Sequence, residues 1–236
     1  IGLAPNTSGQ SDVDFSQVFS GILANEPAFA VDLVSANLVN IPDTQNPGTW
    51  TTIGSVTGMS FFAGDFLNGD FSKLYVLDYY TSGMYSLDTT TAAYTLIGNS
   101  AVAMGESWTG MDGASDGTLY ASSTNCAGSS TIYTINPSTG ETSVIGNTGI
   151  SCLIAIASNA EGEMYGVDIA SDNLYRIDTA TGTSSVIGSL GIDANYAQGM
   201  DFEEETGILY WAAYSISTGP ELRVIDTSTG ASSLIG

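Results

Sequence analysis

One short sequence motif, or phrase, occurs five times along this chain and limits the folds that the chain can adopt. Each copy ends in an Ile-Gly pair, and successive pairs lie 42 to 48 residues apart. The pairs are Ile53-Gly54, Ile97-Gly98, Ile145-Gly146, Ile187-Gly188 and Ile235-Gly236. A period of this length is typical of repeat proteins, in which each unit becomes stable only by packing against its neighbours.

The fourth copy shows the repeat unit most clearly. Three apolar runs, 164–168, 174–178 and 184–188, are rich in Tyr, Ile and Val and are bounded by Gly, Asn, Asp or Ser. This pattern predicts short β-strands rather than helices. A further strand is expected ahead of these three, as in the phrases at 58–61, 110–112 and 199–202. Each copy therefore predicts four strands.

Four antiparallel strands repeated every 40 to 50 residues predict an all-β fold, a β-propeller of about five blades. The first copy is degenerate: 28–32 aligns with 74–78, and 18–22 is expected to be its innermost strand. The propeller is expected over residues 15–236 as a single domain. Residues 1–14 precede the repeat and form either a flexible arm or a strand that pairs with an edge strand of this or a neighbouring copy.

The phrase Leu74-Tyr75-Val76-Leu77-Asp78 and the repeated Leu-Tyr-x-Ile-Asp-x-x-Thr-Gly resemble the YVTN, NHL and SMP-30-like bacterial β-propeller repeats. The resemblance covers about residues 18–236 and implies the fold. Members of that group serve as lactonases, binding modules and surface proteins, so the resemblance does not choose a function. The metal-site pattern of the lactonase members is not visible in this sequence.

Composition excludes several kinds of partner and chemistry. The chain has 25 acidic residues against three basic ones, giving a net charge of −22. Such a charge disfavours nucleic acid and anionic membrane surfaces, and no apolar run is long enough to insert into a bilayer. The absence of histidine removes the commonest general base and metal ligand.

Beginning at Ile1 without a leader, the chain is expected to be a processed, secreted protein of the cell surface or extracellular space.

The two cysteines are predicted to form a disulfide. In a propeller, the loops between blades share one face with the loops joining the second and third strands, and this face is called the upper face. Cys126 lies in a second-to-third loop and Cys152 lies just before the next inner strand. Adjacent blades therefore bring them to one face, and an oxidising compartment favours a bond over two free thiols.

Aromatic residues of the upper face are candidates for ligand binding. They are Tyr79, Tyr80, Trp108, Tyr196 and Tyr214. Exposed rings at a concave mouth stack on sugars or anchor peptides, so a glycan or a protein is the expected partner. The alternative is that these rings pack between blades as core.

Carboxylates are the candidate metal ligands, with Ca²⁺ as the cation. Asp112 and Asp201 are expected at the third position of inner strands that line the channel, where Ser60 and Ala157 hold the same position. On the opposite face, Asp65, Asn68 and Asp70 resemble a calcium loop in ligand type but not in spacing. Solvation in a wet channel and ordinary turn chemistry are the alternatives.

The function predicted from these features is a non-catalytic binding or structural module. Self-assembly on the cell surface or into filaments, with residues 1–14 or an exposed outer strand as connector, is its sharper form. The alternative is a carboxylate-dependent, glycan-active enzyme with its site at the channel mouth. That alternative requires an acid of raised pKa, which the sequence does not single out.

Overall fold

A computed structural model describes residues 27–203 and 206–236. Within these ranges the chain forms nineteen β-strands and no helix. The expected strand at 18–22, the arm at 1–14, Glu204 and Glu205 lie outside the described residues.

The strands form five antiparallel sheets in chain order, and each sheet is one blade. Blade one has β1 (Ala28–Asp32), β2 (Asn37–Ile41) and β3 (Thr51–Ser55). Blade two has β4 (Phe61–Asp65), β5 (Lys73–Asp78), β6 (Gly83–Asp88) and β7 (Tyr94–Asn99). Blade three has β8 (Ser107–Gly113), β9 (Leu119–Thr124), β10 (Ser130–Ile135) and β11 (Thr142–Asn147). Blade four has β12 (Leu153–Ser158), β13 (Met164–Asp168), β14 (Asn173–Ile177) and β15 (Ser184–Ser189). Blade five has β16 (Gly199–Glu203), β17 (Ile208–Ser215), β18 (Gly219–Ile225) and β19 (Ser232–Leu234).

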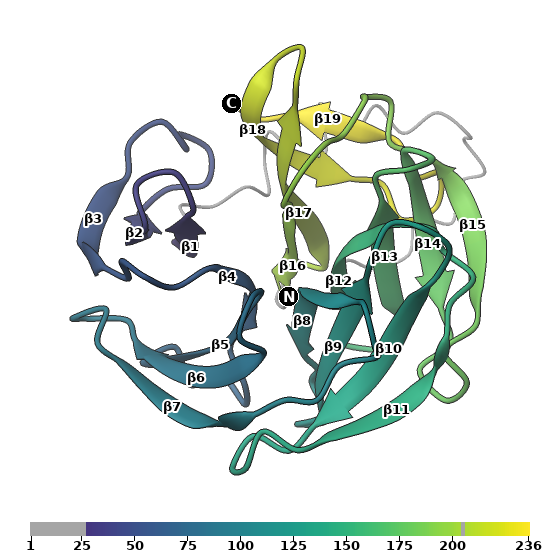
Figure 1. The fold of residues 1–236 in the computed structure, drawn as a ribbon. Coiled ribbons are helices and arrows are strands. Elements are labelled where there is room, and N and C mark those ends of the chain that lie inside the picture. The colour runs from purple at the N-terminus through teal and green to yellow at the C-terminus, as the bar shows by residue number, and fades with distance from the viewer. Residues whose placement is uncertain (1–26, 204–205) are drawn as a thin grey trace.

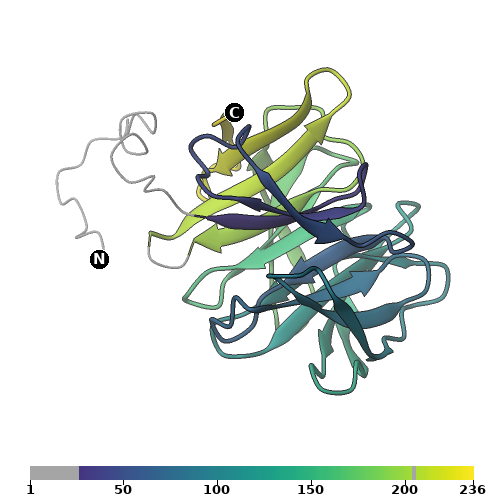
Figure 2. The same cartoon turned by 90° about the vertical axis from the view of Figure 1, so that its left-hand side faces the viewer.

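The blades stand around a common axis as a five-bladed propeller (Figure 1). The inner strands β4, β8, β12 and β16 are neighbours in that order and surround the channel. Figure 1 looks down on the upper face, and Figure 2 shows from the side that the loops gather on two opposite faces. The predicted propeller of about five blades is therefore confirmed.

Apolar side chains between neighbouring blades form the core. One cluster joins blades two and three through Tyr75, Leu77, Trp108 and Met111. A second joins blades four and five, and similar clusters join blades one and two and blades three and four. Because each blade buries its faces only against its neighbours, the ring rather than the single sheet is the stable unit.

Each Ile-Gly pair has a structural role at the junction with the next blade. In blades one to four, the pairing register shifts at this Ile, which forms a β-bulge in the outer strand. The bulged Ile side chains pack against the inter-blade clusters. A Cβ atom on Gly98 would lie 2.0 Å from the Thr139 carbonyl oxygen of the next blade, and Gly146 and Gly188 meet Thr181 and Thr229 at the same distance. Only glycine permits this approach.

The last Ile-Gly pair brings the end of the described chain back to the first blade. A Cβ atom on Gly236 would lie 3.0 Å from Cγ of Pro47, in the loop between β2 and β3. Blade five thus meets blade one at the position where the other blades meet their successors.

Candidate functional site

The upper-face hairpins of three blades are built in the same way. An Asp ends the second strand, and its carboxylate accepts a hydrogen bond from the backbone N–H two residues later and one from the hydroxyl group three residues later. In blade two, Asp78 accepts from Tyr80 N at 3.1 Å and from Thr81 Oγ1 at 2.9 Å. Asp32 in blade one and Asp168 in blade four cap their turns in the same manner. The residue two positions after each Asp therefore stands at the tip of a fixed turn.

Two groups of aromatic rings lie on this face. Phe62 packs on Tyr79 with ring centroids 4.6 Å apart, and Tyr79 packs on Tyr80 at 5.1 Å. Tyr80 is 78% exposed, so this chain of three rings leads from the inner strand β4 to open solvent. In blade five, the rings of Tyr196 and Tyr214 are 5.6 Å apart.

The second group is held by an amide side chain. Gln198 is buried; its Nε2 donates to Tyr214 O at 2.9 Å, and its Oε1 accepts from Tyr214 N at 3.0 Å. Tyr196 has a backbone φ of 59° and is 67% exposed. The ring of Tyr196 is therefore presented from a constrained loop, as a binding residue requires.

Trp108 does not belong to this surface, which corrects the expectation from the sequence. It is fully buried on β8, its Nε1 donates to Ser100 O at 3.3 Å, and its ring packs edge-on to Tyr133 at 4.8 Å. The strand begins at Ser107, one residue before Trp108, so the ring points between blades rather than from a loop. For this residue, the core interpretation is the correct one.

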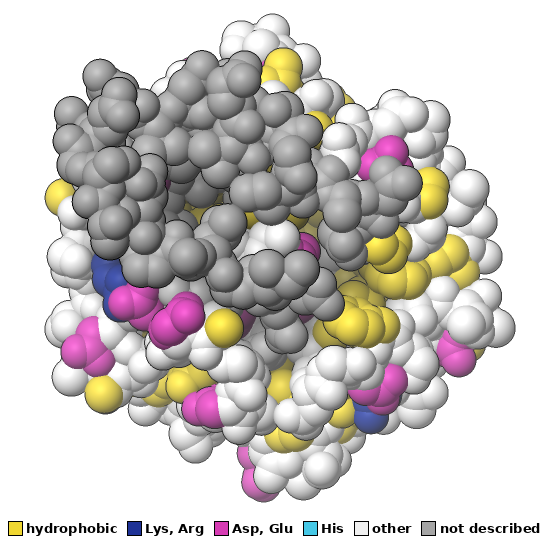
Figure 3. All heavy atoms as spheres, turned by 180° about the vertical axis from the view of Figure 1, so that it is seen from behind, with side chains coloured by type: hydrophobic (Ala, Val, Ile, Leu, Met, Phe, Trp, Pro, Cys, Tyr) yellow, Lys and Arg dark blue, Asp and Glu magenta, His cyan; other side chains and the backbone are white. Residues whose placement is uncertain are grey.

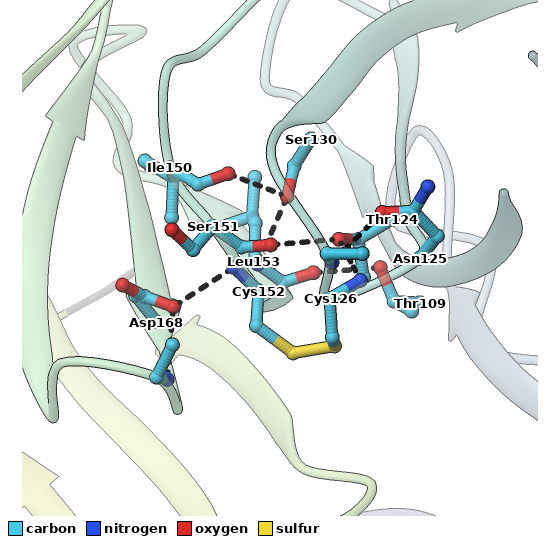
Figure 4. The surroundings of a disulfide bond; sticks show 12 residues. Thr109, Thr124, Asn125, Cys126, Ser130, Ile150, Ser151, Cys152, Leu153 and Asp168 are labelled. Atoms are coloured by element: carbon cyan, nitrogen blue, oxygen red, sulfur yellow. Dashed lines mark hydrogen bonds between the residues drawn. A yellow bond between two sulfur atoms is a disulfide. The ribbon is translucent and has the colours of Figure 1, made fainter.

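Cys126 and Cys152 form the expected disulfide between blades three and four (Figure 4). Cys152 is buried, and its backbone N–H donates to Asp168 Oδ1 at 3.0 Å. Nearby, Ser130 Oγ donates to Ile150 O and accepts from Leu153 N, each at 3.0 Å. The covalent bond and these hydrogen bonds fix the upper end of β12 to blade three.

Three aspartates hold equivalent positions at the lower end of the inner strands. Asp65, Asp112 and Asp201 each lie opposite the Tyr of the next strand, namely Tyr75, Tyr120 and Tyr210, and Ala157 lies opposite Tyr165. The position assigned to Ser60 from the sequence therefore belongs to Asp65. Ser60 precedes β4, and its backbone N–H donates to Asp78 Oδ2 at 2.6 Å on the upper face.

Two of these carboxylates connect neighbouring blades. Asp65 Oδ2 accepts from Gly113 N at 2.7 Å, and Gly113 directly follows Asp112. Asp112 in turn accepts from Ser158 N at 2.8 Å and from Ser158 Oγ at 2.6 Å, and Ser158 follows Ala157. Each carboxylate thus binds the residue after its counterpart in the next blade.

Burial changes the protonation behaviour of these groups. Burial, with smaller contributions from the negative charges of Asp201 and Asp112, holds the pKa of Asp65 well above its usual range. Burial also raises the pKa of Asp112, against the hydrogen bonds from Ser158 that lower it. The channel therefore contains carboxyl groups that ionise less readily than surface carboxyl groups.

The candidate calcium run on the lower face does not form one ligand set. Asp65 belongs to the channel, whereas Asn68 is in a turn with φ of 56° and Asp70 accepts from Ser72 N and Oγ at 3.1 and 2.5 Å. Across residues 27–203 and 206–236, no three Asp, Glu, Cys or His residues are grouped as a metal would require. Asp178 and Asp226 accept hydrogen bonds within their own turns.

Both arginines lie on third strands and are engaged with acids. Arg176 contacts Glu163 at 2.5 Å and lies over the ring of Tyr165, 5.2 Å from its centroid. Arg223 contacts Glu221 at 2.5 Å. Arg176 holds the pKa of Glu163 below its usual range. Neither cation lies on an inner strand, so neither is placed to bind an anion in the channel.

The lower face, seen in Figure 3, has acidic side chains scattered among neutral ones. A hollow of about 260 Å³ lies there between blades three and four. Its lining includes Asp116, Tyr120, Ser158 and Glu161, next to the Asp112 connection. The described residues include no helix long and apolar enough to cross a membrane.

Comparisons with known proteins place the chain by fold. No family model and no curated protein sequence matches it. Among solved structures, the calcium-binding protein regucalcin from Agrobacterium tumefaciens superposes with a TM-score of 0.56 at 19% identity, over 87% of this chain and 68% of that one. The resemblance is one of fold.

Two other structures support the same conclusion. A protein from Bacteroides thetaiotaomicron has a TM-score of 0.62 at 17% identity, over 90% of this chain and 55% of that one. A chain of the nidogen/laminin complex has a TM-score of 0.61 at 13% identity, over 88% of this chain and 76% of that one. The resemblance to the β-propeller repeat group stated from the sequence is therefore confirmed at the level of the fold.

Proposed function

We propose that this chain is a secreted, non-catalytic module that binds or builds extracellular structures through its upper face. The carrying observation is the pair of aromatic groups there, Phe62-Tyr79-Tyr80 and Tyr196-Tyr214. Exposed rings on constrained loops have the geometry of sites that bind a glycan or a protein. The carboxylates of the channel support the same proposal, because Asp65 and Asp112 are used to connect blades.

The binding test uses a panel of neutral glycans and the variants Tyr80→Ala and Tyr196→Ala. Both rings are exposed, so the variants are expected to keep the wild-type unfolding midpoint and to lose binding at least tenfold. The matched control is Tyr94→Ala, a partly exposed ring on the outer strand β7. Equal binding by all four proteins would overturn the role of the upper face.

Self-assembly is the sharper form of this proposal, with residues 1–14 as connector. It is supported by blade one, whose described sheet has three strands with β1 at its inner edge, whereas the other blades have four. The test deletes residues 1–14 and compares particles by electron microscopy. Filaments from the full chain and isolated particles from the deletion are expected. Unchanged filaments, or a strictly monomeric full chain, would overturn the connector.

One observation favours a second candidate, a glycan-active enzyme. Asp65 has the raised pKa that a general acid needs, near the carboxylates of Asp112 and Asp201. The test is hydrolysis of the same glycan panel by wild type, Asp65→Asn and Asp201→Asn. Turnover by wild type that both variants lose would establish the enzyme, and no turnover by wild type would remove it.

Calcium stays a prediction for the same channel. Regucalcin is described as a calcium-binding protein, but its identity to this chain is too low to transfer the site. A calcium titration followed by thermal unfolding decides the question. Binding at the channel carboxylates Asp112 and Asp201 requires an unfolding midpoint that rises with calcium in wild type and not in Asp201→Asn.

A further inference from the structure

Two adjoining hollows lie at the lower end of blade four. One, of about 440 Å³, lies at the lower ends of β13, β14 and β15, and the other, of about 260 Å³, lies between blades three and four. Gly162 and Thr179 line both, so the two hollows form one groove, called the lower groove. Ligand sites usually measure about 300–1,000 Å³, so this groove is large enough to be one. Its lining includes Tyr120, Glu161, Glu163, Arg176, Thr179 and Ser185.

The repeat does not require the arginine of this groove. Arg176 lies opposite Tyr165. The residues opposite the equivalent Tyr of blades two, three and five are Ser86, Thr134 and Val224. Stability does not explain the arginine either, because it and Glu163 are each 40% exposed and an exposed ion pair is typically worth about 0–1 kcal/mol. The side chain of Arg176 is therefore explained best by a contact outside the fold.

Hydrogen bonds fix the pair of Arg176 and Glu163 in place. Glu163 Oε1 contacts Arg176 Nη2 at 2.5 Å. Its Oε2 accepts from Asn159 Nδ2 at 3.0 Å and from the Tyr165 hydroxyl group at 3.1 Å. Arg176 Nη1 donates to the same hydroxyl group at 3.3 Å. Because a guanidinium group has five N–H donors, several remain for a ligand, and they are held in one orientation before it binds.

Other polar groups of the lower groove also have no hydrogen-bond partner among the described residues. They are the hydroxyl groups of Thr179 and Ser185 and the carboxylate of Glu161. In the hollow between blades three and four, the partly buried ring of Tyr120 adds an apolar surface. Donors, acceptors and one aromatic ring therefore line a single groove.

The charges of the lining select the chemical class of the ligand. The acids are Asp116, Glu161, Glu163 and Asp178, and Arg176 is the only cation of the lining, so an anionic ligand is repelled. In the part of the chain that the structure describes, no three acids are grouped as a metal would require. A ligand hydroxyl group both donates and accepts hydrogen bonds, so it matches neighbouring carboxylate, hydroxyl and N–H groups.

We infer that the lower groove binds a neutral saccharide, with Arg176 and Ser185 bonding to its hydroxyl groups and Tyr120 packing against the apolar face of a sugar ring. Because the groove extends from blade three to the outer strand of blade four, a saccharide chain fits it better than a single sugar. The groove lies on the face opposite to Tyr80 and Tyr196, so this site goes beyond the function proposed above and is independent of it.

The experiment titrates the full chain with saccharide hexamers by calorimetry. Cellohexaose, xylohexaose and mannohexaose are the neutral probes, a chitosan hexamer is the cationic probe and a galacturonate hexamer is the anionic probe. Every protein carries Tyr80→Ala and Tyr196→Ala, which remove the site proposed for the upper face, so any binding that remains belongs elsewhere.

Two substitutions in this background test the lower groove. Ser185→Tyr fills the groove with a ring, and Arg176→Ser places there the residue that blade two has. The matched control is Ser143→Tyr, at the equivalent exposed position of β11 in blade three. Thermal unfolding verifies that each protein is folded. Because Ser185 is exposed, Ser185→Tyr decides the outcome even where Arg176→Ser does not fold.

We expect at least one neutral probe to bind the background protein and the Ser143→Tyr control equally, and Ser185→Tyr and Arg176→Ser to lose about tenfold or more in affinity. Equal binding by Ser185→Tyr and the control would overturn the lower groove as the site. Binding of the chitosan or galacturonate hexamer alone would overturn a neutral ligand. No binding of any probe in this background would overturn the inference, whereas the upper-face site is tested separately by the chain with Tyr80 and Tyr196 intact.

Discussion

Asp65 Oδ2 accepts a 2.7 Å hydrogen bond from the backbone N–H of Gly113, and through it the inner strand of blade two holds the inner strand of blade three. Asp112 repeats the contact to Ser158 of blade four. At Ala157 the series is interrupted, because alanine has no acceptor. Asp65 and Asp112 therefore hold neighbouring blades together, and this role requires no bound ligand.

Removing one of these connections is expected to destabilise the ring. Asp112→Ala leaves the N–H and hydroxyl group of the partly buried Ser158 without their acceptor, and losing hydrogen bonds to a carboxylate costs about 1–3 kcal/mol. Urea denaturation measures the change in unfolding free energy. The control is Asp116→Ala, an exposed residue of the following turn. Equal effects of the two variants would contradict the inter-blade role of Asp112.

The protonation of Asp65 makes the stability of the fold depend on pH, and the sign of this dependence follows from the direction of the pKa shift. Folding raises the pKa of the Asp65 carboxyl group. Its contribution to the free energy of unfolding is therefore largest below the unfolded-state pKa and is lost as the pH rises through the folded-state pKa. Asp65→Asn removes that dependence. We therefore expect the stability of wild type minus that of Asp65→Asn to fall between pH 3.5 and pH 8, measured by thermal unfolding. A difference that grows with pH would contradict the assignment.

The glycine of each Ile-Gly pair is expected to be irreplaceable. Gly98→Ala places a methyl group 2.0 Å from the Thr139 carbonyl oxygen, so the backbones of blades two and three must separate. Overpacking of this kind costs about 1–3 kcal/mol. Gly48→Ala is the control, because nothing lies within 4 Å of its Cβ position. A Gly98→Ala variant as stable as the control would show that the blades are not in this contact.

The disulfide is expected to stabilise the junction of blades three and four. It spans 26 residues, and closing a loop of that length is worth about 3 kcal/mol in the chain-entropy account. Denaturation with and without a reducing agent measures the loss. The variant Cys126→Ser with Cys152→Ser should match the reduced wild type and should not respond to the reductant.

Much of this architecture follows from the sequence because the repeat is local and regular. The Ile-Gly pairs mark the outer strands, and the Leu-Tyr phrases mark the second and third strands of the clear copies. The role of the glycine was not predictable in this way, because it depends on a turn of the next blade, as in Gly98 and Thr139, which are 139−98 = 41 residues apart. Contacts between blades leave no local signal.

The assignment of the channel position failed in blade two for a related reason. Gly58-Met59 matches Gly110-Met111, but the first pair precedes β4 whereas the second lies within β8, so the residue after each pair holds a different position in its blade. The aspartate precedes the Tyr of the Leu-Tyr phrase by 10 residues in blade two (75−65), by 8 in blade three (120−112) and by 9 in blade five (210−201), so no fixed count identifies Asp65, and only the pairing between the strands does. Register between strands, not similarity of letters, decides which residue lines the channel.

The size of the native particle tests most directly the proposal that this ring assembles with copies of itself. Sedimentation velocity of the full 24.4 kDa chain, at several concentrations in 50 mM and 1 M NaCl, makes this measurement. Because a net charge of −22 opposes association and salt screens it, we expect species that grow with concentration and grow further in 1 M NaCl. A single monomeric species under every condition would contradict the account.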